Sequence, residues 1–344
     1  MINPFEAIGI TRLKKTQNGY GVCRFSVKIG NTKNITFGGL LLKYKEWLNE
    51  WLDYYVKPTT KERTYSKYCR IVKNHINTAL GDYEMDELSA NVLQHFTVEL
   101  TEKGLSANTV NVFLSVIKSS LRRAVLLGIT EKEYSSAIVR PKVREKRVKC
   151  FSKEEQKKIE AYISEKNKPK LFGIVLCLYT GLRIGELLAL EWSDIDLQKG
   201  TISISKTCHD SWQNGHYVKV IDTPKTECSQ RTIPIPKQLI ARIKEHKKHV
   251  NGTFVIGGKS EYGIGVRSYQ RTFENLLKNL GIAHKGFHSL RHTFATRALE
   301  CGMDIKTLSE ILGHTNASVT LKRYAHSMLE HKTEMMNRVG KFLL

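Results

Sequence analysis

The sequence has no run of 18 or more apolar residues, and its first ten residues, MINPFEAIGI, lack a basic region followed by an apolar core. These absences argue against a membrane-spanning helix and a secretory signal peptide. The seven cysteines are scattered and none forms a Cys-x-x-Cys pair, which argues against a disulfide framework and a zinc finger. We therefore expect a cytoplasmic protein without a membrane partner.

Acidic residues are scarce relative to basic ones. The chain of 344 residues has 33 Asp and Glu against 55 Lys and Arg, for a net charge of +22. Such an excess suits a polyanion, because a protein that neutralises phosphates releases condensed counterions. This indicates a nucleic-acid partner, with a solvated basic surface or attraction to a membrane surface as alternatives. The length predicts two or three domains.

The N-terminal part favours strands and the next part favours helices. Alternation from Tyr20 to Val27, followed by Gly30-Asn31, predicts a β-hairpin, either a small module or a hairpin docked on the next domain. From Leu41 to about Ile129 the apolar spacing predicts four helices whose aromatics form a core rather than stack on bases. The first helix is expected from Leu41, and the second from a Thr59/Thr60 cap to about Leu80. The third is expected from Ser89 to Gly104, and the fourth from Ser106/Asn108 to Gly128.

A basic stretch separates this bundle from the rest of the chain. Pro141 breaks helices, and valines alternate with basic residues, so we expect an extended linker. Between two DNA-binding domains it would lie along phosphates; the alternative is a merely solvated linker. The candidate DNA-binding residues are Arg140, Lys142, Arg144, Lys146, Arg147 and Lys149.

The second half begins with Ser152 and Glu155 in the pattern of a capping box. An apolar helix then ends at Thr180-Gly181, and Arg183 follows with Glu186 three residues on. An arginine among so many apolar residues has to be paired, with Glu186 as the simplest partner, or bind an anion. Next, GTISISKT, HYVKVID and SQRTIPI predict a three-stranded β-meander, with Lys225 in the turn before the last strand.

The segment from Phe287 to His326 concentrates His288, Arg291, His314 and Tyr324. His288 and Arg291 share a helix face, so an imidazole and a guanidinium can point at one target. An arginine fork matches phosphate geometry, and histidine moves protons near neutral pH. Leu312-Gly313-His314 predicts a helix stop. The segment thus offers a phenolic nucleophile beside phosphate-binding groups.

Taken in order, these motifs resemble the tyrosine site-specific recombinases, the integrases of phages and integrative conjugative elements. The motifs are Thr-Gly-Leu-Arg183-Ile-Gly-Glu186, Thr-Pro-Lys225-Thr-x-x-Ser-x-Arg, His288-x-Leu-Arg291, Leu-Gly-His314 and Tyr324-x-His326. The resemblance covers about residues 41–335. It implies a mainly α fold with a small antiparallel β-sheet, in which a helical SAM-like core-binding domain and a catalytic domain form a C-shaped clamp around DNA.

The resemblance implies cleavage and rejoining of DNA through a covalent 3′-phosphotyrosyl intermediate formed by Tyr324, with no cofactor, metal or ATP. Arg183 and Arg291 would clamp the phosphate, and Lys225 would protonate the leaving 5′-oxygen. His288 would act as general base or hydrogen-bond the phosphate, while His314 would donate a hydrogen bond to it. Glu186 would hold Arg183 in place.

Three rival interpretations use the same residues. His288 and His292 have the spacing of a zinc-binding helix pair, but Ser289 follows where a metalloprotease has glutamate. Tyr324 would be a core aromatic if the protein were a catalytically silent DNA-binding regulator. A topoisomerase of type IB would cleave and reseal one strand without exchange.

The expected organisation is an N-terminal hairpin or reduced arm-type segment (1–40), a core-binding domain (41–136), a linker (137–150), a catalytic domain (151–335) and a tail (336–344). The expected partners are double-stranded DNA with inverted-repeat core sites, three further copies in a tetramer, and accessory excision or host DNA-bending factors. The tail, with Met336, Val339 and Leu343 at helical spacing, would cap its own domain or pack on a neighbouring subunit. The enzyme would integrate or excise a phage or mobile element at the nucleoid.

Overall fold

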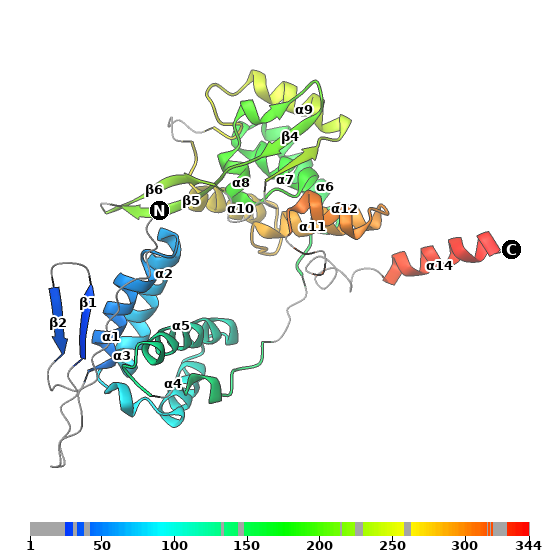
Figure 1. The fold of residues 1–344 in the computed structure, drawn as a ribbon. Coiled ribbons are helices and arrows are strands. Elements are labelled where there is room, and N and C mark those ends of the chain that lie inside the picture. The colour runs from blue at the N-terminus through cyan, green and yellow to red at the C-terminus, as the bar shows by residue number, and fades with distance from the viewer. Residues whose placement is uncertain are drawn as a thin grey trace, which may run out of the picture. The chain divides into compact units, whose positions relative to one another are not determined.

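Two compact units make up the chain, Met1–Glu145 and Lys146–Leu344, in a computed structural model (Figure 1). It describes residues 25–29, 33–37, 42–131, 134–143, 148–213, 215–223, 230–257, 263–314, 316, 318 and 329–343. The division falls within the predicted linker 137–150. The predicted site residues Lys225 and Tyr324, and the linker residues Arg144, Lys146 and Arg147, lie outside the described residues.

The described part of unit 1 begins with a hairpin. Strands β1 (Phe25–Ile29) and β2 (Lys33–Phe37) pair antiparallel, with Val27 opposite Ile35. A hairpin was predicted here, and the pairing of these two strands confirms it. Residues 20–24 of the predicted strand and the Gly30-Asn31 turn lie outside the described residues.

The helices of unit 1 follow the four predicted stretches. Two of them start at the predicted caps, since Ser89 Oγ accepts a hydrogen bond from Val92 N (3.4 Å) and Ser106 Oγ from Thr109 N (3.2 Å). The elements are α1 (Tyr44–Glu50), the π-helix η2 (Trp51–Val56), α2 (Glu62–Ile71), the π-helix η3 (Val72–Ile76), α3 (Asn77–Leu80), η4 (Met85–Glu87), α4 (Ala90–Glu102), α5 (Ala107–Leu126) and η5 (Ser135–Ala137).

The predicted cap of the second helix is wrong. Helix α2 has Lys61 as its N-cap, and the two threonines before it serve the preceding helix instead. Thr59 Oγ1 donates to Tyr55 O (2.6 Å) and Thr60 Oγ1 to Val56 O (2.8 Å). Hydroxyl groups satisfy the last carbonyls of one helix as readily as the first amides of the next, so residue type alone does not decide between the two.

Buried aromatics hold unit 1 together. Tyr44, Trp47 and Trp51 lie in its core, as predicted. The polar atoms of the first two have partners on α5, because Tyr44 Oη lies 2.8 Å from Ser120 Oγ and Trp47 Nε1 donates to Ser120 O (3.2 Å). Burying such large rings with their polar atoms bonded ties α1 to α5.

Unit 2 is built around the apolar helix α7, whose C-terminal stop at Gly181 was predicted and is confirmed. The predicted capping box is also confirmed: Glu155 N donates to Ser152 Oγ (3.1 Å) and Ser152 N to Glu155 Oε2 (2.8 Å). The helices are α6 (Lys153–Lys166), η6 (Pro169–Leu171), α7 (Phe172–Thr180), α8 (Ile184–Ala189), η7 (Trp192–Asp194), α9 (Lys237–Lys248), α10 (Val266–Asn279), α11 (His288–Glu300), α12 (Ile305–Leu312) and α14 (Leu329–Leu343).

The predicted three-stranded meander is wrong. The first and third predicted strands, β4 (Thr201–Ile204) and β7 (Arg231–Pro234), pair with each other, and β3 (Ile195–Asp196) joins β4. The middle one, β6 (His216–Asp222), pairs instead with β5 (Thr207–Gln213) in a separate hairpin. The β5 sequence, TCHDSWQ, lacks regular apolar alternation, so pattern reading missed it and gave its place in the sheet to β6.

Among the residues that the structure describes, none belongs to a helix long and apolar enough to cross a membrane.

Candidate active site

Arg183 and Glu186 are paired at the start of α8. Arg183 Nη1 lies 2.6 Å from Glu186 Oε1, and Arg183 N donates to Glu186 Oε2 (3.0 Å). The Glu186 side chain is only 4% exposed, whereas that of Arg183 is 35% exposed. The pairing expected from the sequence is therefore present, and it leaves the guanidinium of Arg183 partly open to solvent.

A second arginine, Arg231 at the start of β7, binds the same carboxylate; it was not among the predicted site residues. Arg231 Nη1 lies 3.1 Å from Glu186 Oε1 and Arg231 Nη2 lies 2.8 Å from Glu186 Oε2. This is the bidentate fork-to-fork geometry that makes arginine–carboxylate pairs strong. A sequence signal was available, because residues 231, 233 and 235 face one side of a strand and Ile233 and Ile235 are core residues. An arginine on a core-facing side needs a buried partner.

Arg291 lies inside unit 2, with 2% of its surface exposed. Its Nη1 donates to Gly181 O (2.9 Å) and its Nη2 to Leu312 O (2.6 Å). Gly181 follows the last residue of α7, and Leu312 is the last residue of α12. The guanidinium thus lies between two helix C-termini, whose partial negative charge favours a buried cation.

The C-terminal end of α12 brings the three arginines together. His314 N bonds Ser309 O and Gly313 N bonds Glu310 O, each at 3.0 Å, in the pattern of a Schellman motif. The next three carbonyls each accept from a different guanidinium. Ile311 O accepts from Arg231 Nε (2.6 Å), Leu312 O from Arg291, and Gly313 O from Arg183 Nη2 (2.9 Å).

Two glycines make this close packing possible. Gly181 and Gly313 both have positive φ, 67° and 64°, where glycine is favoured. A Cβ on Gly313 would lie 3.0 Å from Arg231 Cδ and Nη1, and one on Gly181 would lie 2.8 Å from Leu312 Cδ2. The helix stop predicted at Leu312-Gly313 is confirmed, and the packing shows why glycine is needed there.

The two predicted histidines lie on either side of Arg291 in the sequence. His288 is the first residue of α11, one turn before Arg291, and is exposed. Its ring centroid lies 4.5 Å from that of His292, edge to face. His314 directly follows Gly313 and is half-buried. No group of three His, Cys, Asp or Glu side chains that would suit a metal ion occurs among the described residues.

The charge state of the cluster is set by Glu186. Burial alone would raise the pKa of this carboxyl, but the hydrogen bonds and charge of Arg231, together with the charge of Arg183, hold the pKa at about 2. Glu186 is therefore an anion at neutral pH. With it ionised, three arginines and one carboxylate leave the cluster cationic, which suits a phosphate diester.

The hairpin β5–β6 precedes the segment that carries Lys225, and its middle is bonded to neighbouring elements. Asp210 accepts from Val266 N and Arg267 N, both at 2.8 Å, and so caps α10. Lys219 Nζ donates to Leu188 O (2.8 Å) and lies 3.8 Å from the ring centroid of Phe254. Burial lowers the pKa of Lys219. These contacts fix the middle of the hairpin, from which β6 continues to Asp222.

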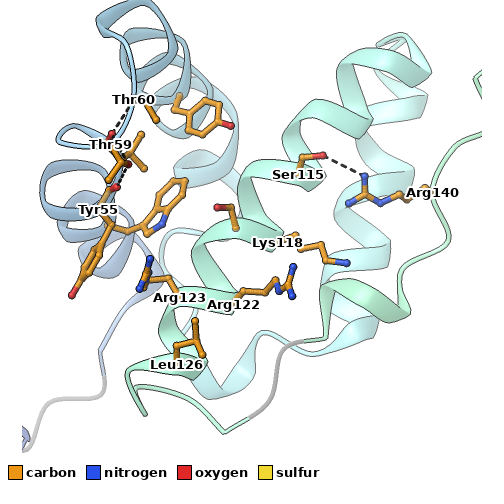
Figure 2. A pocket seen from close by; sticks show the side chains of 13 residues that line it. Tyr55, Thr59, Thr60, Ser115, Lys118, Arg122, Arg123, Leu126 and Arg140 are labelled. Carbon is orange, nitrogen blue, oxygen red and sulfur yellow. Dashed lines mark hydrogen bonds between the residues drawn. The ribbon is translucent and has the colours of Figure 1, made fainter. Parts of the chain in front are cut away.

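Unit 1 has a basic groove of about 500 Å³ between η2, α2 and α5 (Figure 2). Its charged lining residues are all cationic. Ser115, Ser119, Arg122 and Leu126 line it from one face of α5, at helical spacing. The complete lining is Trp51, Tyr55, Val56, Thr59, Thr60, Tyr68, Ser115, Lys118, Ser119, Arg122, Arg123, Leu126 and Arg140.

Two cations of the groove are oriented by neighbours. Arg123 lies over the ring of Tyr55, 5.1 Å from its centroid, and Arg140 Nη1 donates to Ser115 Oγ (3.3 Å), as Figure 2 shows. Arg140 is thus a linker residue predicted to bind DNA that the structure places in the groove. Lys142 and Lys149 are exposed and are not part of this lining.

Two buried arginines and one partly exposed arginine surround a helix end, and a histidine follows next in the chain; such a site is suited to phosphate chemistry. Residues 148–331 match the Phage integrase family, and residues 43–101 match the N-terminal SAM-like domain of phage integrases. The chain belongs to this family, the tyrosine recombinases, which are enzymes that cleave and rejoin DNA.

Individual relatives agree. The chain is 30% identical to a XerC-like tyrosine recombinase of Caldanaerobacter subterraneus subsp. tengcongensis, over 92% of this chain and 87% of the relative. It is 25% identical to the ICEBs1 integrase of Bacillus subtilis, over 83% and 79% respectively.

Solved structures share the fold. A Tn1549 transposon integrase in complex with transposon right end DNA has a TM-score of 0.74 and 23% identity, covering 87% of this chain and all (100%) of that one. A lambda integrase dimer bound to a COC′ core site has a TM-score of 0.64 and 19% identity, covering 81% and 97%. The mainly helical fold with small antiparallel sheets, expected from the sequence, is confirmed.

Proposed function

We propose that this recombinase integrates or excises a mobile element or phage through a covalent 3′-phosphotyrosyl link to Tyr324. The observation that carries the proposal is the convergence of Arg183, Arg231 and Arg291 on the end of α12, from which the chain runs on to His314 and Tyr324. A preorganised cationic cluster is what stabilises the charge that develops when a phenol attacks a phosphate diester.

In the proposed reaction, Tyr324 Oη bonds to the scissile phosphorus and the bond to the 5′-oxygen breaks. Arg183 and Arg291 stabilise the charge that develops on the non-bridging oxygens. Arg183 is the more exposed of the two, so it is the one that the phosphate reaches first. The covalent link conserves the energy of the phosphodiester, so rejoining needs neither ATP nor a metal ion.

Two proton transfers accompany this exchange of bonds. Lys225 gives a proton to the leaving 5′-oxygen, which becomes a hydroxyl. His288 takes the phenolic proton, or it hydrogen-bonds the phosphate while the phenolic proton passes to solvent water. His314 donates a hydrogen bond to the phosphate.

The test of the nucleophile uses a nicked suicide DNA substrate, on which a cleaved strand cannot be rejoined. Wild-type protein is expected to form an adduct that resists SDS, and Tyr324→Phe to bind the same DNA without forming it. Tyr83→Phe, at an exposed tyrosine of unit 1, is the matched control and keeps the adduct. An adduct that persists in Tyr324→Phe refutes the assignment.

A second assay distinguishes recombination from topoisomerase-like resealing. Two duplexes with matched sites are incubated with the protein, and exchanged products are measured beside the relaxation of supercoiled DNA. We expect exchange. Relaxation without exchange would assign the type IB topoisomerase reaction to the same residues.

The basic groove of unit 1 supports a second contact with DNA. Lys118, Arg122 and Arg140 line it without a carboxylate among the lining residues, so it presents an uncompensated cationic surface to a phosphate backbone. We propose that unit 1 grips the DNA backbone here, with the exposed linker residues Lys142 and Lys149 following the strand. The protein would then close around the duplex as a clamp.

The proposed assembly is a tetramer on two inverted-repeat core sites. Helix α14 supports it, because Met336, Val339, Phe342 and Leu343 are exposed apolar residues that a neighbouring copy would cover. The residues before 41 would serve as a reduced arm-type segment, and 41–136 and 151–335 as core-binding and catalytic domains. Action at the nucleoid in the cytoplasm, with accessory excision or DNA-bending factors, completes the proposal.

A further inference from the structure

Arg231 makes contacts that couple two parts of the proposed site. Its fork holds both oxygens of Glu186, and its Nε donates to Ile311 O (2.6 Å). The same two oxygens accept from Arg183, one from Nη1 (2.6 Å) and one from the backbone N (3.0 Å). Each carboxylate oxygen therefore receives one bond from Arg231 and one from Arg183.

This arrangement fixes the rotation of the carboxylate. A carboxylate held only by Arg183 could turn about its last side-chain bonds and carry the guanidinium with it. The bidentate bond from Arg231, whose side chain is 7% exposed, removes that freedom. Arg183 is the member of the cluster that is open to solvent. Because Arg183 is bonded to Glu186, and Glu186 is held by Arg231, the position of this exposed side chain depends on the buried Arg231.

The hydrogen bond from Arg231 Nε to Ile311 O fixes the C-terminal end of α12. Ile311, Leu312 and Gly313 end α12, and His314 follows directly. The turn wraps so closely around Arg231 that a Cβ on Gly313 would lie 3.0 Å from Arg231 Cδ. The chain that continues towards Tyr324 thus leaves α12 from a point set by this side chain.

We propose that Arg231 is a positioning residue for strand cleavage, which sets Arg183 through Glu186 and sets the start of the segment carrying His314 and Tyr324 through Ile311. This rests on the proposed function of Tyr324 as nucleophile. Arg231 itself touches neither DNA nor the reacting atoms in this proposal. A lysine at this position offers one compact ammonium group instead of a fork, so it cannot make all three bonds at once.

The test measures the first-order rate of adduct formation at saturating suicide DNA. Arg231→Met is expected to lower this rate about 100-fold, the scale of a misplacement near 1 Å. Arg231→Lys is expected to recover part of it, to about 10-fold below wild type, and DNA affinity in both is expected to stay within about threefold. Arg242→Met, which removes the ion pair with Glu160 on the same unit, is the matched control and keeps the wild-type rate.

A pH profile gives a readout that a structural role would not move. Three charged or titratable groups act on Glu186: Arg183 at the N-cap of α8, Arg231 on β7 and Cys177 on α7. Arg291 of α11 acts in turn on Cys177. Without Arg231, burial is opposed by Arg183 alone, so the pKa of Glu186 rises. Arg231→Met should therefore lose adduct formation as pH falls from 7 to 5, more steeply than wild type. Adding Glu186→Gln should remove this extra loss.

The outcomes separate cleanly. Wild-type rate and pH profile in Arg231→Met would overturn the proposal. So would unfolding of every variant at this position, lysine included, because Arg231 would then be a residue of the fold alone. Failure of the wild-type protein to form an adduct would instead refute the proposed function, and leaves the folding and DNA affinity of the variants to be measured separately. Equal effects of Arg231→Met with and without Glu186→Gln would show that Arg231 does not act through Glu186.

Discussion

Glu186 is predicted to link the stability of unit 2 to pH. Its carboxyl is buried, yet two arginines keep it ionised down to a pKa of about 2, against 4.5 for an unperturbed glutamate. The folded-state pKa lies below the unfolded value, so the carboxylate stabilises the fold fully above pH 4.5. That stabilisation is lost as pH falls towards 2.

The size of the effect follows from the two pKa values. A difference of about 2.5 units corresponds to roughly 3 kcal/mol in the free energy of unfolding. About 2 kcal/mol of this is lost by pH 3, where the unfolded carboxyl is protonated and the folded one is still largely ionised. In Glu186→Gln this pH dependence is absent, because the amide does not titrate. The gap in stability between wild type and variant should thus narrow by about 2 kcal/mol between pH 6 and pH 3.

The assay must follow unit 2 alone, because Trp47 and Trp51 make fluorescence sensitive to unit 1. Urea titrations at each pH, read by a hydrogen-exchange pulse in α7, give the free energy of unfolding for unit 2. Glu310→Gln, at an exposed side chain of α12, is the control and should leave the gap nearly constant. A gap between wild type and Glu186→Gln that does not change with pH would refute the account of the buried carboxylate.

Three further predictions concern DNA binding, packing and assembly. The double variant Lys118→Glu, Arg122→Glu should bind DNA more weakly and flatten the slope of log affinity against log salt by about 2. An unchanged slope in a fluorescence titration would exclude the groove as a phosphate-binding site. Gly181→Ala should lower the free energy of unfolding in urea by about 2–4 kcal/mol, because its Cβ would lie 2.5 Å from an aromatic carbon. Gly302→Ala, where the Cβ would meet open space, should lower it by only about 1 kcal/mol. Equal losses in the two variants would contradict the packing argument. Phe342→Asp, at a side chain 90% exposed, should leave the thermal stability and the affinity for a single DNA site unchanged. It should reduce the amount of tetramer formed on paired DNA sites in native gels. An unaltered amount of tetramer would rule out this face of α14 as an interface.

Much of the fold was predictable because its signals are local. Ser89, Ser106 and the Ser152–Glu155 box cap helices through residues three positions away, and Gly181 and Gly313 end helices through their own φ. Such signals need no knowledge of the rest of the chain. The strand pairing was not predictable in the same way. The partner of β6 is decided by tertiary packing, and β5 has too little apolar alternation to be recognised alone.

In the candidate active site, too, local contacts were predictable from the sequence and distant ones were not. The sequence indicated the pair Arg183–Glu186, since the two residues are three apart and one of them is surrounded by apolar residues. It did not indicate that Arg231, 45 positions from Glu186, shares this carboxylate. This contact joins a strand to the start of a helix that is distant in the sequence. Its only sequence signal is indirect: an arginine on the core-facing side of a short strand.

The three arginines are arranged by folding rather than by substrate. Each guanidinium is held by groups of the protein, by the carboxylate of Glu186, by the carbonyl after α7, or by the last carbonyls of α12. Preorganised charges of this kind need not reorganise when charge develops in a transition state, which is where electrostatic catalysis gains most. The cost is borne in the folded state, where buried cations need helix ends and a shared carboxylate as partners. It follows that substitutions of these partners should impair cleavage before they impair DNA binding.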